Sequence, residues 1–176
     1  MRITLLLLFI TGVFYVKANG QKIIIDGKET NRKLVWSDFT GKPDPNSSFF
    51  AYTWWKLSYS YSGTEPDADS VRVKNFDAKL QLDKEKSWVK KGRETDELLV
   101  HEQGHFNVGI LCVREMVATM NAKRFPREGL QAAIQSTFNE VLQKYKAMGQ
   151  QYDSETQHGN NKEVQEQWNS FFKERL

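Results

Sequence analysis

Two of the chain's three histidines flank a glutamate in the segment His101-Glu102-Gln103-Gly104-His105. Residues four positions apart in a helix project from the same face, so both imidazoles could reach one Zn²⁺ ion at about 2.0–2.1 Å. Glu102 would lie on the neighbouring flank, where it can take the proton of a zinc-bound water as general base. The ion would lower the pKa of that water and polarise the carbonyl group under attack. The spacing therefore predicts hydrolysis of peptide or amide bonds at a catalytic zinc site.

The alternative interpretation of the motif is a pair of helix-surface histidines without a metal. Gly104 weakly favours the metal site, because glycine costs a helix interior about 1 kcal/mol relative to alanine. Its presence inside a predicted helix indicates that another backbone or a ligand approaches closely at this point.

A catalytic zinc site usually has three protein ligands and a water molecule. His158 is the remaining histidine, and its place after the second predicted helix allows the chain to fold back onto the first. We therefore favour His158 as the third ligand. Asp153 and Glu155 are the alternates, and Glu128 or Glu140 of the second helix are further acidic candidates.

Two more residues near the motif have a chemical and a structural interpretation. Tyr152 could donate a hydrogen bond to the oxyanion of the reaction, although a buried structural tyrosine is the favoured interpretation. Cys112 falls on the histidine-bearing face of the predicted helix, where a small buried hydrophobe is favoured over a thiol catalyst. As the chain's lone cysteine, Cys112 excludes an intrachain disulfide and a four-thiolate zinc site.

The second half of the chain predicts the helices that would position these groups. Thr95 or Asp96 is a suitable N-cap, and the motif helix is expected to run to about Asn121. Apolar residues on two of its sides predict a central helix that packs on both faces. A second helix is expected after Pro126, and Lys162–Leu176 is expected to form a docking helix.

The first half predicts strands. Lys22–Asp26 is a short strand, and the alternating residues of Phe49–Tyr61 indicate a strand with one apolar face. Gly63–Ser70 has the composition of a turn, and Val71–Leu82 predicts a second long strand with a bulge near Lys74-Asn75. The two long strands are expected to pair antiparallel. The fold class is therefore α+β, with an N-terminal antiparallel β-sheet followed by helices.

The first residues are typical of a secretory signal peptide. Arg2 precedes an apolar run over residues 3–16, and cleavage is expected after Ala18, with Gly20 as the competing site. The run is shorter than the roughly 20 apolar residues that span a bilayer, so no stable membrane anchor is expected. Residues 19–176 would then form a single domain that is secreted or periplasmic.

Charge excludes one class of partner. The net charge falls from +3 to +1 once Arg2 and Lys17 are removed, which is too little for a nucleic-acid surface. The expected partner is a peptide or protein substrate, and the sequence does not indicate an oligomeric state. The edge of the Phe49–Tyr61 strand could accept an extended peptide by strand addition, although burial of its apolar face is favoured.

Several segments, taken in order, resemble a bacterial family of predicted secreted zinc-dependent proteases that has long been catalogued as a domain of unknown function. They are residues 34–41 (LVWSDFTG), 87–89 (SWV), 99–106 (LVHEQGHF), 152–159 (YDSETQHG) and 167–169 (QWN). The resemblance implies a zincin-like metallopeptidase with zinc on His101 and His105 and with Glu102 as the base. It leaves the third ligand open.

The alternative function is a non-catalytic exported module for envelope binding or assembly, in which the zinc site is structural or vestigial. Glu102 separates the two functions, because a structural histidine site does not need a general base beside it. We therefore expect an exported zinc-dependent peptidase.

Overall fold

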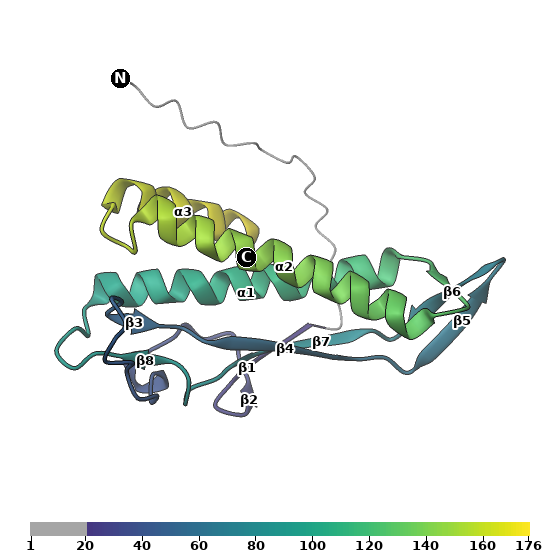
Figure 1. The fold of residues 1–176 in the computed structure, drawn as a ribbon, viewed down its shortest axis with the longest axis horizontal. Coiled ribbons are helices and arrows are strands. Elements are labelled where there is room, and N and C mark those ends of the chain that lie inside the picture. The colour runs from purple at the N-terminus through teal and green to yellow at the C-terminus, as the bar shows by residue number, and fades with distance from the viewer. Residues whose placement is uncertain (1–20) are drawn as a thin grey trace, which may run out of the picture.

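The computed structural model describes residues 21–176. The signal peptide predicted for residues 1–18 lies outside the described residues. The described chain forms three layers, with β-strands on one side, a long helix in the middle, and two further helices on the other side (Figure 1). Within residues 21–176, no helix is both long and apolar enough to cross a membrane.

The central sheet has four strands, in the order β2-β1-β7-β4. Their bounds are Lys28–Glu29 for β2, Gln21–Ile25 for β1, Asp77–Leu82 for β7 and Trp55–Ser60 for β4. β4 and β7 pair antiparallel, with Leu57 opposite Leu80, as the alternation predicts. β1 runs parallel to β7, so the sheet is mixed and not antiparallel throughout. Strands this far apart in the chain need no hairpin between them, which removes the preference for antiparallel pairing.

The prediction of a turn over the whole of Gly63–Ser70 is wrong, because most of this segment belongs to a second sheet. β5 (Gly63–Asp67) and β6 (Ser70–Lys74) form a hairpin, and β6 also pairs with β9 (Phe125–Pro126). Pairing with these partners outweighs the low strand propensity of the segment. Asn75, at φ 50°, separates β6 from β7, so the predicted bulge is a full break. The hairpin projects from one end of the molecule (Figure 1).

At the opposite end, two short strands lie below the start of the central helix. β3 (Ala51–Tyr52) pairs antiparallel with β8 (Trp88–Val89). Residues 53 and 54 interrupt the extended chain between β3 and β4, so the aromatic segment is not one continuous strand. β3 contacts the central helix, and this contact brings its polar neighbours to the histidine motif.

The central helix, α1, extends over Asp96–Ala122 and is buried on two faces. Both its predicted span and its predicted packing are confirmed. The Thr95 hydroxyl accepts a hydrogen bond from the backbone N–H of Leu98 at 3.2 Å, which caps the helix. On one side, a Cβ at Gly109 would touch Trp55 and Leu80 of the sheet. Two helices cover the other side, so α1 is the middle layer of the molecule.

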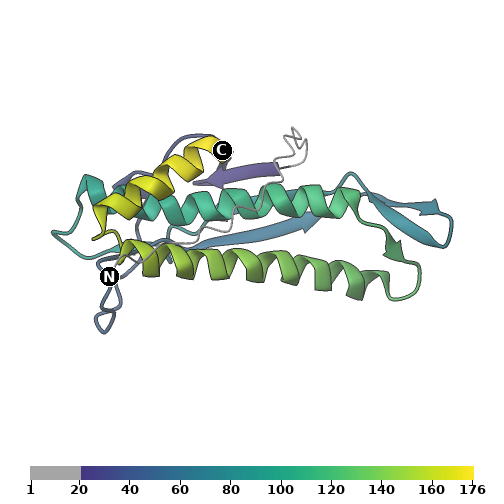
Figure 2. The same ribbon diagram turned by 90° about the horizontal axis from the view of Figure 1, so that it is seen from above.

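α2 (Leu130–Thr156) runs antiparallel to α1, and α3 (Lys162–Arg175) turns back across both helices (Figure 2). α2 extends through Tyr152-Asp153, a segment without a predicted helix. Trp168 and Phe172 of α3 are buried, as expected for a docking helix. The end of α2 and the start of α3 therefore meet above the N-terminal half of α1.

A buried carboxylate fixes the loop that precedes β3. Asp38 is 1% exposed and accepts hydrogen bonds from both terminal nitrogens of Arg32, at 2.6 and 2.7 Å, and from the backbone N–H of Val35 at 3.0 Å. Burial acts to raise the pKa of Asp38, but these hydrogen bonds and the Arg32 charge hold it below its ordinary value. In the same loop, the backbone N–H of Leu34 donates to Gln103 of α1 at 2.7 Å. The carboxylate therefore helps to hold this loop against the motif helix.

Asp38→Asn is expected to lower the free energy of unfolding at neutral pH by about 1–3 kcal/mol, because the amide loses the charge-assisted pair with Arg32. A lowered pKa in the folded state means that the stabilisation is present above the unfolded pKa of about 3.9 and is lost as the pH falls through the folded value. Urea denaturation between about pH 5 and pH 2.5 should show wild type and variant converging. Asp69→Asn, at an exposed position, is the control. An equal loss for both variants would contradict the role of Asp38.

Candidate metal centre

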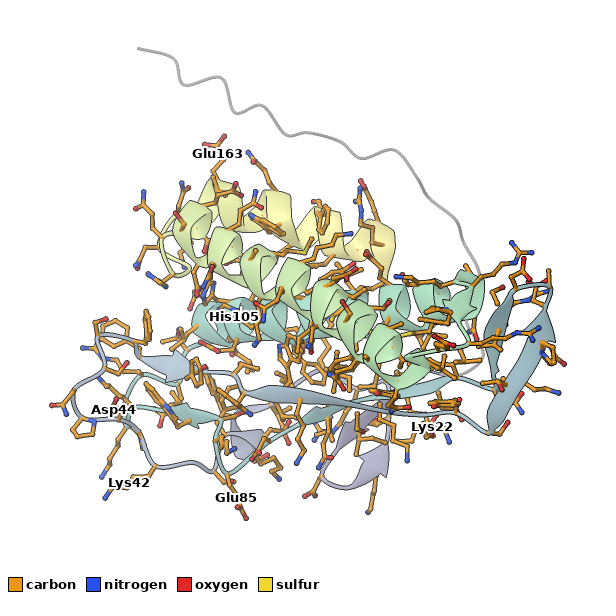
Figure 3. The ribbon with its side chains drawn as sticks, turned by 45° about the vertical axis from the view of Figure 1, so that its right-hand side comes forward. Lys22, Lys42, Asp44, Glu85, His105 and Glu163 are labelled. Atoms are coloured by element: carbon orange, nitrogen blue, oxygen red, sulfur yellow. The ribbon has the colours of Figure 1, made fainter. Side chains whose placement is uncertain are left out.

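The two histidines of the motif lie one turn apart on α1 and face the end of α2, as their spacing predicts. The His101 side chain is 3% exposed and the His105 side chain is 20% exposed. Their rings meet edge to face, with centroids 4.9 Å apart. The label of His105 in Figure 3 marks the site, between the helices above and the strands below.

The carboxylate of Asp153 lies among the rings of all three histidines. Its Oδ1 is 3.2 Å from Nε2 of His101, 2.9 Å from Nε2 of His105 and 3.3 Å from Nδ1 of His158. Asp153 comes from the last turns of α2, and His158 from the turn that follows this helix. The structure thus brings together both sequence-predicted histidine ligands, the favoured third ligand and one of its alternates.

The charges at this point favour a cation. Burial acts to raise the pKa of Asp153, but hydrogen bonds with His101 and His105 and the charges of these rings hold it well below its usual range. Burial acts to lower the pKa of His105, yet the hydrogen bond to Asp153 and the charges of Glu102 and Asp153 raise it overall. Two carboxylates therefore favour positive charge at the histidine cluster, whether a proton or a metal ion supplies it.

The donor set fits zinc. Imidazole nitrogen and carboxylate oxygen are among its preferred ligands, and two ligands at 2.0–2.1 Å in tetrahedral geometry lie about 3.3 Å apart. The contacts of Asp153 Oδ1 with the three ring nitrogens, at 2.9–3.3 Å, are close to this separation. Ligand atoms of His101, Asp153 and His158 all lie within 4.8 Å of one another. His105 is not part of this group, but its Nε2 contacts Asp153 Oδ1 at 2.9 Å. His101 also has an oxygen acceptor at each ring nitrogen, which a neutral imidazole cannot satisfy alone.

The other acidic candidates lie elsewhere. The Glu155 carboxylate accepts hydrogen bonds from Trp168 Nε1 and from Gln151 Nε2, each at 2.8 Å, so it ties α3 to α2. Glu140 is exposed and accepts a hydrogen bond from Ser136. Glu128 is exposed before the start of α2, at the opposite end of this helix from the cluster. The structure does not bring these three residues to the histidines.

Glu102 is buried beside the cluster and is held by a residue that sequence reasoning missed. The Thr53 hydroxyl donates to Oε2 of Glu102 at 2.6 Å. Thr53 follows β3 and is 8% exposed, so the strand segment fixes the carboxylate from the side opposite the helices. A threonine in an aromatic strand carries no local signal of this role, since only the tertiary contact of β3 with α1 creates it.

A pocket of about 340 Å³ opens onto the cluster. Glu102 and Asp153 line it together with the three histidines, and residues 48–53 form its opposite wall. Phe49 and Phe50 of this wall are 41% and 45% exposed, and the Phe49 ring lies 4.9 Å from the His158 ring. Polar groups that converge on one side and apolar rings on the other are typical of a ligand site.

Tyr152 lies behind the histidines and not in the pocket. It is fully buried, its hydroxyl donates to the backbone carbonyl of His101 at 3.0 Å, and its ring stacks on the His101 ring at 4.7 Å. Burial raises its pKa above the ordinary value, so the hydroxyl stays protonated as a donor. This geometry supports the structural interpretation of Tyr152 over the oxyanion donor.

Gly104 is where Tyr152 meets α1. A Cβ at Gly104 would overlap the hydroxyl and the ring of Tyr152. The close approach indicated by this glycine is therefore that of a side chain, and neither a backbone nor a ligand. Glycine lets α2 bring its tyrosine directly against the α1 backbone.

Cys112, two turns beyond His105, is completely buried, and burial raises the pKa of its thiol to about 12. The thiolate needed for nucleophilic chemistry is therefore disfavoured. This environment supports the interpretation of Cys112 as a small core residue.

A chain with a histidine-carboxylate cluster between two antiparallel helices and the turn after the second, above a mixed sheet, has the architecture of an α+β protein with a candidate metal site. Residues 26–159, well over half of the chain, match the family described as "Bacterial protein of unknown function (DUF922)", and the chain belongs to this family. The match includes the motif helix and His158, whereas α3 lies beyond it. No curated protein and no solved structure matches the chain at significant similarity. The comparisons therefore identify neither a metal nor a reaction for this chain.

Gly104→Ala is expected to destabilise the fold by about 1–3 kcal/mol, because the added methyl group must push the buried Tyr152 side chain away from α1. Gly149→Ala is the matched control. Gly149 lies within α2, and a methyl group added there would meet no atom within 4 Å, so alanine should stabilise the helix by about 0.5–1 kcal/mol. Urea denaturation of both variants measures the difference. If Gly104→Ala changed the free energy of unfolding as little as Gly149→Ala does, Tyr152 would not pack against Gly104 as described.

Proposed function

We propose that this chain is an exported zinc-dependent peptidase that hydrolyses peptide or amide bonds in a peptide or protein substrate. The observation that carries the proposal is the buried Glu102 carboxylate, which lines the same pocket as the cluster of three histidines and Asp153. The predicted signal peptide supports a secreted or periplasmic location.

We propose His101, His105 and Asp153 as the zinc ligands. The sequence favours His158 as the third ligand, but two observations support its alternate. Asp153 Oδ1 contacts a ring nitrogen of every histidine, and Asp153 belongs to a regular helix. The His158 side chain is 51% exposed on the turn that follows, at the wall of the pocket. A zinc ion bound there would polarise the substrate carbonyl and lower the pKa of a coordinated water.

The protein's own groups would carry the proton. Glu102 accepts a proton as the water oxygen attacks the carbonyl carbon, and it returns this proton to the amine nitrogen as the C–N bond breaks. Thr53 holds the Glu102 carboxylate at the pocket wall through its 2.6 Å hydrogen bond. His158, which lines the same pocket, would donate a hydrogen bond to the oxygen that becomes negative. The apolar wall of Phe49 and Phe50 would contact side chains of the substrate.

The second candidate function, a non-catalytic exported module for envelope binding or assembly, is favoured by one observation. Four potential ligands lie close together, because Asp153 Oδ1 is within 3.3 Å of a ring nitrogen of His101, His105 and His158. If all four were ligands, they would complete a closed tetrahedral site without a water position, which is typical of structural zinc. The buried carboxylate of Glu102 and the open pocket beside it support the peptidase instead.

Glu102→Gln is expected to reduce turnover of a fluorogenic peptide library by about 10²–10⁴-fold, because the amide cannot accept the proton. Zinc content should stay stoichiometric, since Glu102 is not a proposed ligand. Glu94→Gln, at an exposed position before α1, is the control and should behave as wild type. Unchanged turnover in Glu102→Gln, or the absence of zinc from the purified wild-type protein, would contradict the proposed mechanism.

Asp153→Asn and His158→Ala separate the two third-ligand assignments. Asp153→Asn is expected to weaken zinc binding by more than about 100-fold, beyond the usual effect of residues that only support a ligand. His158→Ala should retain zinc but lose turnover, because it removes the proposed oxyanion donor. Competition with a chromophoric chelator gives the affinities. Loss of zinc from His158→Ala with retention in Asp153→Asn would assign His158 as the ligand.

A further inference from the structure

A polar residue of the C-terminal helix is buried directly behind the candidate metal centre. Gln165 of α3 is 6% exposed, and its Oε1 lies 3.1 Å from Nδ1 of His101. We propose that Gln165 is a positioning residue that keeps the proton of His101 on Nδ1 and so presents the lone pair of Nε2 to the metal. The inference rests on the proposed zinc site and adds a part of the chain beyond the family match at residues 26–159.

The direction of the hydrogen bonds can be followed inward from the surface. Glu166 has a carboxylate, which only accepts, and it receives a hydrogen bond from Nδ2 of Asn169 at 3.1 Å. This contact turns Oδ1 of Asn169 toward Gln165, whose Nε2 donates to it at 3.0 Å. The amide of Gln165 is thereby oriented with Oε1 facing His101. An oxygen at this place requires a hydrogen on Nδ1 of the ring.

Tyr152 supplies an independent constraint with the same result. Nε2 of Gln165 also donates to the Tyr152 hydroxyl oxygen at 2.8 Å, and this hydroxyl donates to the backbone carbonyl of His101 at 3.0 Å. The hydroxyl lies 3.1 Å from Oε1 of Gln165 as well. A phenol has one hydrogen, and because this hydrogen goes to the His101 carbonyl, the hydroxyl oxygen accepts from Nε2 of Gln165. His101, Gln165 and Tyr152 thus form a closed ring of contacts in which each donor faces an acceptor.

The consequence for the metal follows from the geometry of the ring. With Nδ1 committed to Gln165, Nε2 is the nitrogen that faces Asp153 and the site, at 3.2 Å from Oδ1. Residues that orient a ligating histidine typically change metal affinity by 10–100-fold when replaced. Such partners are often carboxylates or backbone carbonyls, whereas here a side-chain amide whose own orientation is fixed from the surface has this role.

Two substitutions at Gln165 separate positioning from packing. Gln165→Met keeps the size of the side chain but removes the acceptor, whereas Gln165→Glu keeps an acceptor and adds a buried charge. A positioning role predicts that zinc affinity falls about 10–100-fold in Gln165→Met and is largely retained in Gln165→Glu. A packing role predicts the reverse order, because methionine is the better buried residue. Gln167→Met, exposed on the same helix, is the matched control.

The measurements are chelator competition for zinc affinity and ¹⁵N NMR of the histidine rings in the zinc-loaded full chain. With three histidines in the chain, the His101 ring can be assigned by comparison with single variants. We expect a protonated, slowly exchanging Nδ1 in wild type and faster exchange in Gln165→Met. A proton on Nε2 of His101, or wild-type affinity in Gln165→Met, would overturn the inference. Failure of wild type to bind zinc would instead overturn the proposed function.

Discussion

The close contact between Tyr152 and Gly104 sets the geometry on which the site depends. With no side chain at Gly104, the Tyr152 ring reaches the α1 backbone, stacks on His101 and donates to the carbonyl of the same residue. Asp153 is the next residue along α2, so the contact that seats the tyrosine also sets the position of the carboxylate. The distances between Asp153 and the histidine rings are thus a consequence of helix packing at one glycine.

The elements with strong local patterns could be predicted from the sequence. The span of α1, its two buried faces and the antiparallel pairing of β4 with β7 follow from periodicity and capping, which short-range physics determines. The spacing of His101 and His105 likewise placed both rings on one face. Two predictions are wrong. The segment Gly63–Ser70 is expected to be a turn, but pairing with β6 outweighs its turn-like composition. The sheet is expected to be antiparallel, but β1 pairs parallel with β7, a contact that no local pattern encodes.

The site shows the same division between local and tertiary information. The type of its side chain alone predicts Asp153 as an alternate ligand, but its central place depends on the extension of α2 through a segment for which no helix is predicted. Thr53 and Gln165 were missed because each touches the motif from a segment far away in the chain. A buried glutamine on an amphipathic helix conflicts with the pattern of its own element, and such a conflict is a signal of function that sequence reasoning can use.

These contacts between distant segments favour the proposed peptidase over a purely structural zinc site. α1 and α2 supply the proposed ligands and the proposed base. The groups that orient the base Glu102 and the ligand His101 come from two flanking segments, with Thr53 beside Glu102 and Gln165 beside His101. A purely structural zinc site has no use for a buried carboxylate held by a hydroxyl next to an open pocket. Because the orienting group on Glu102 comes from the segment that also carries the apolar wall, a substrate bound along residues 48–53 would contact the element that positions the base. Binding and proton transfer would then be coupled through β3.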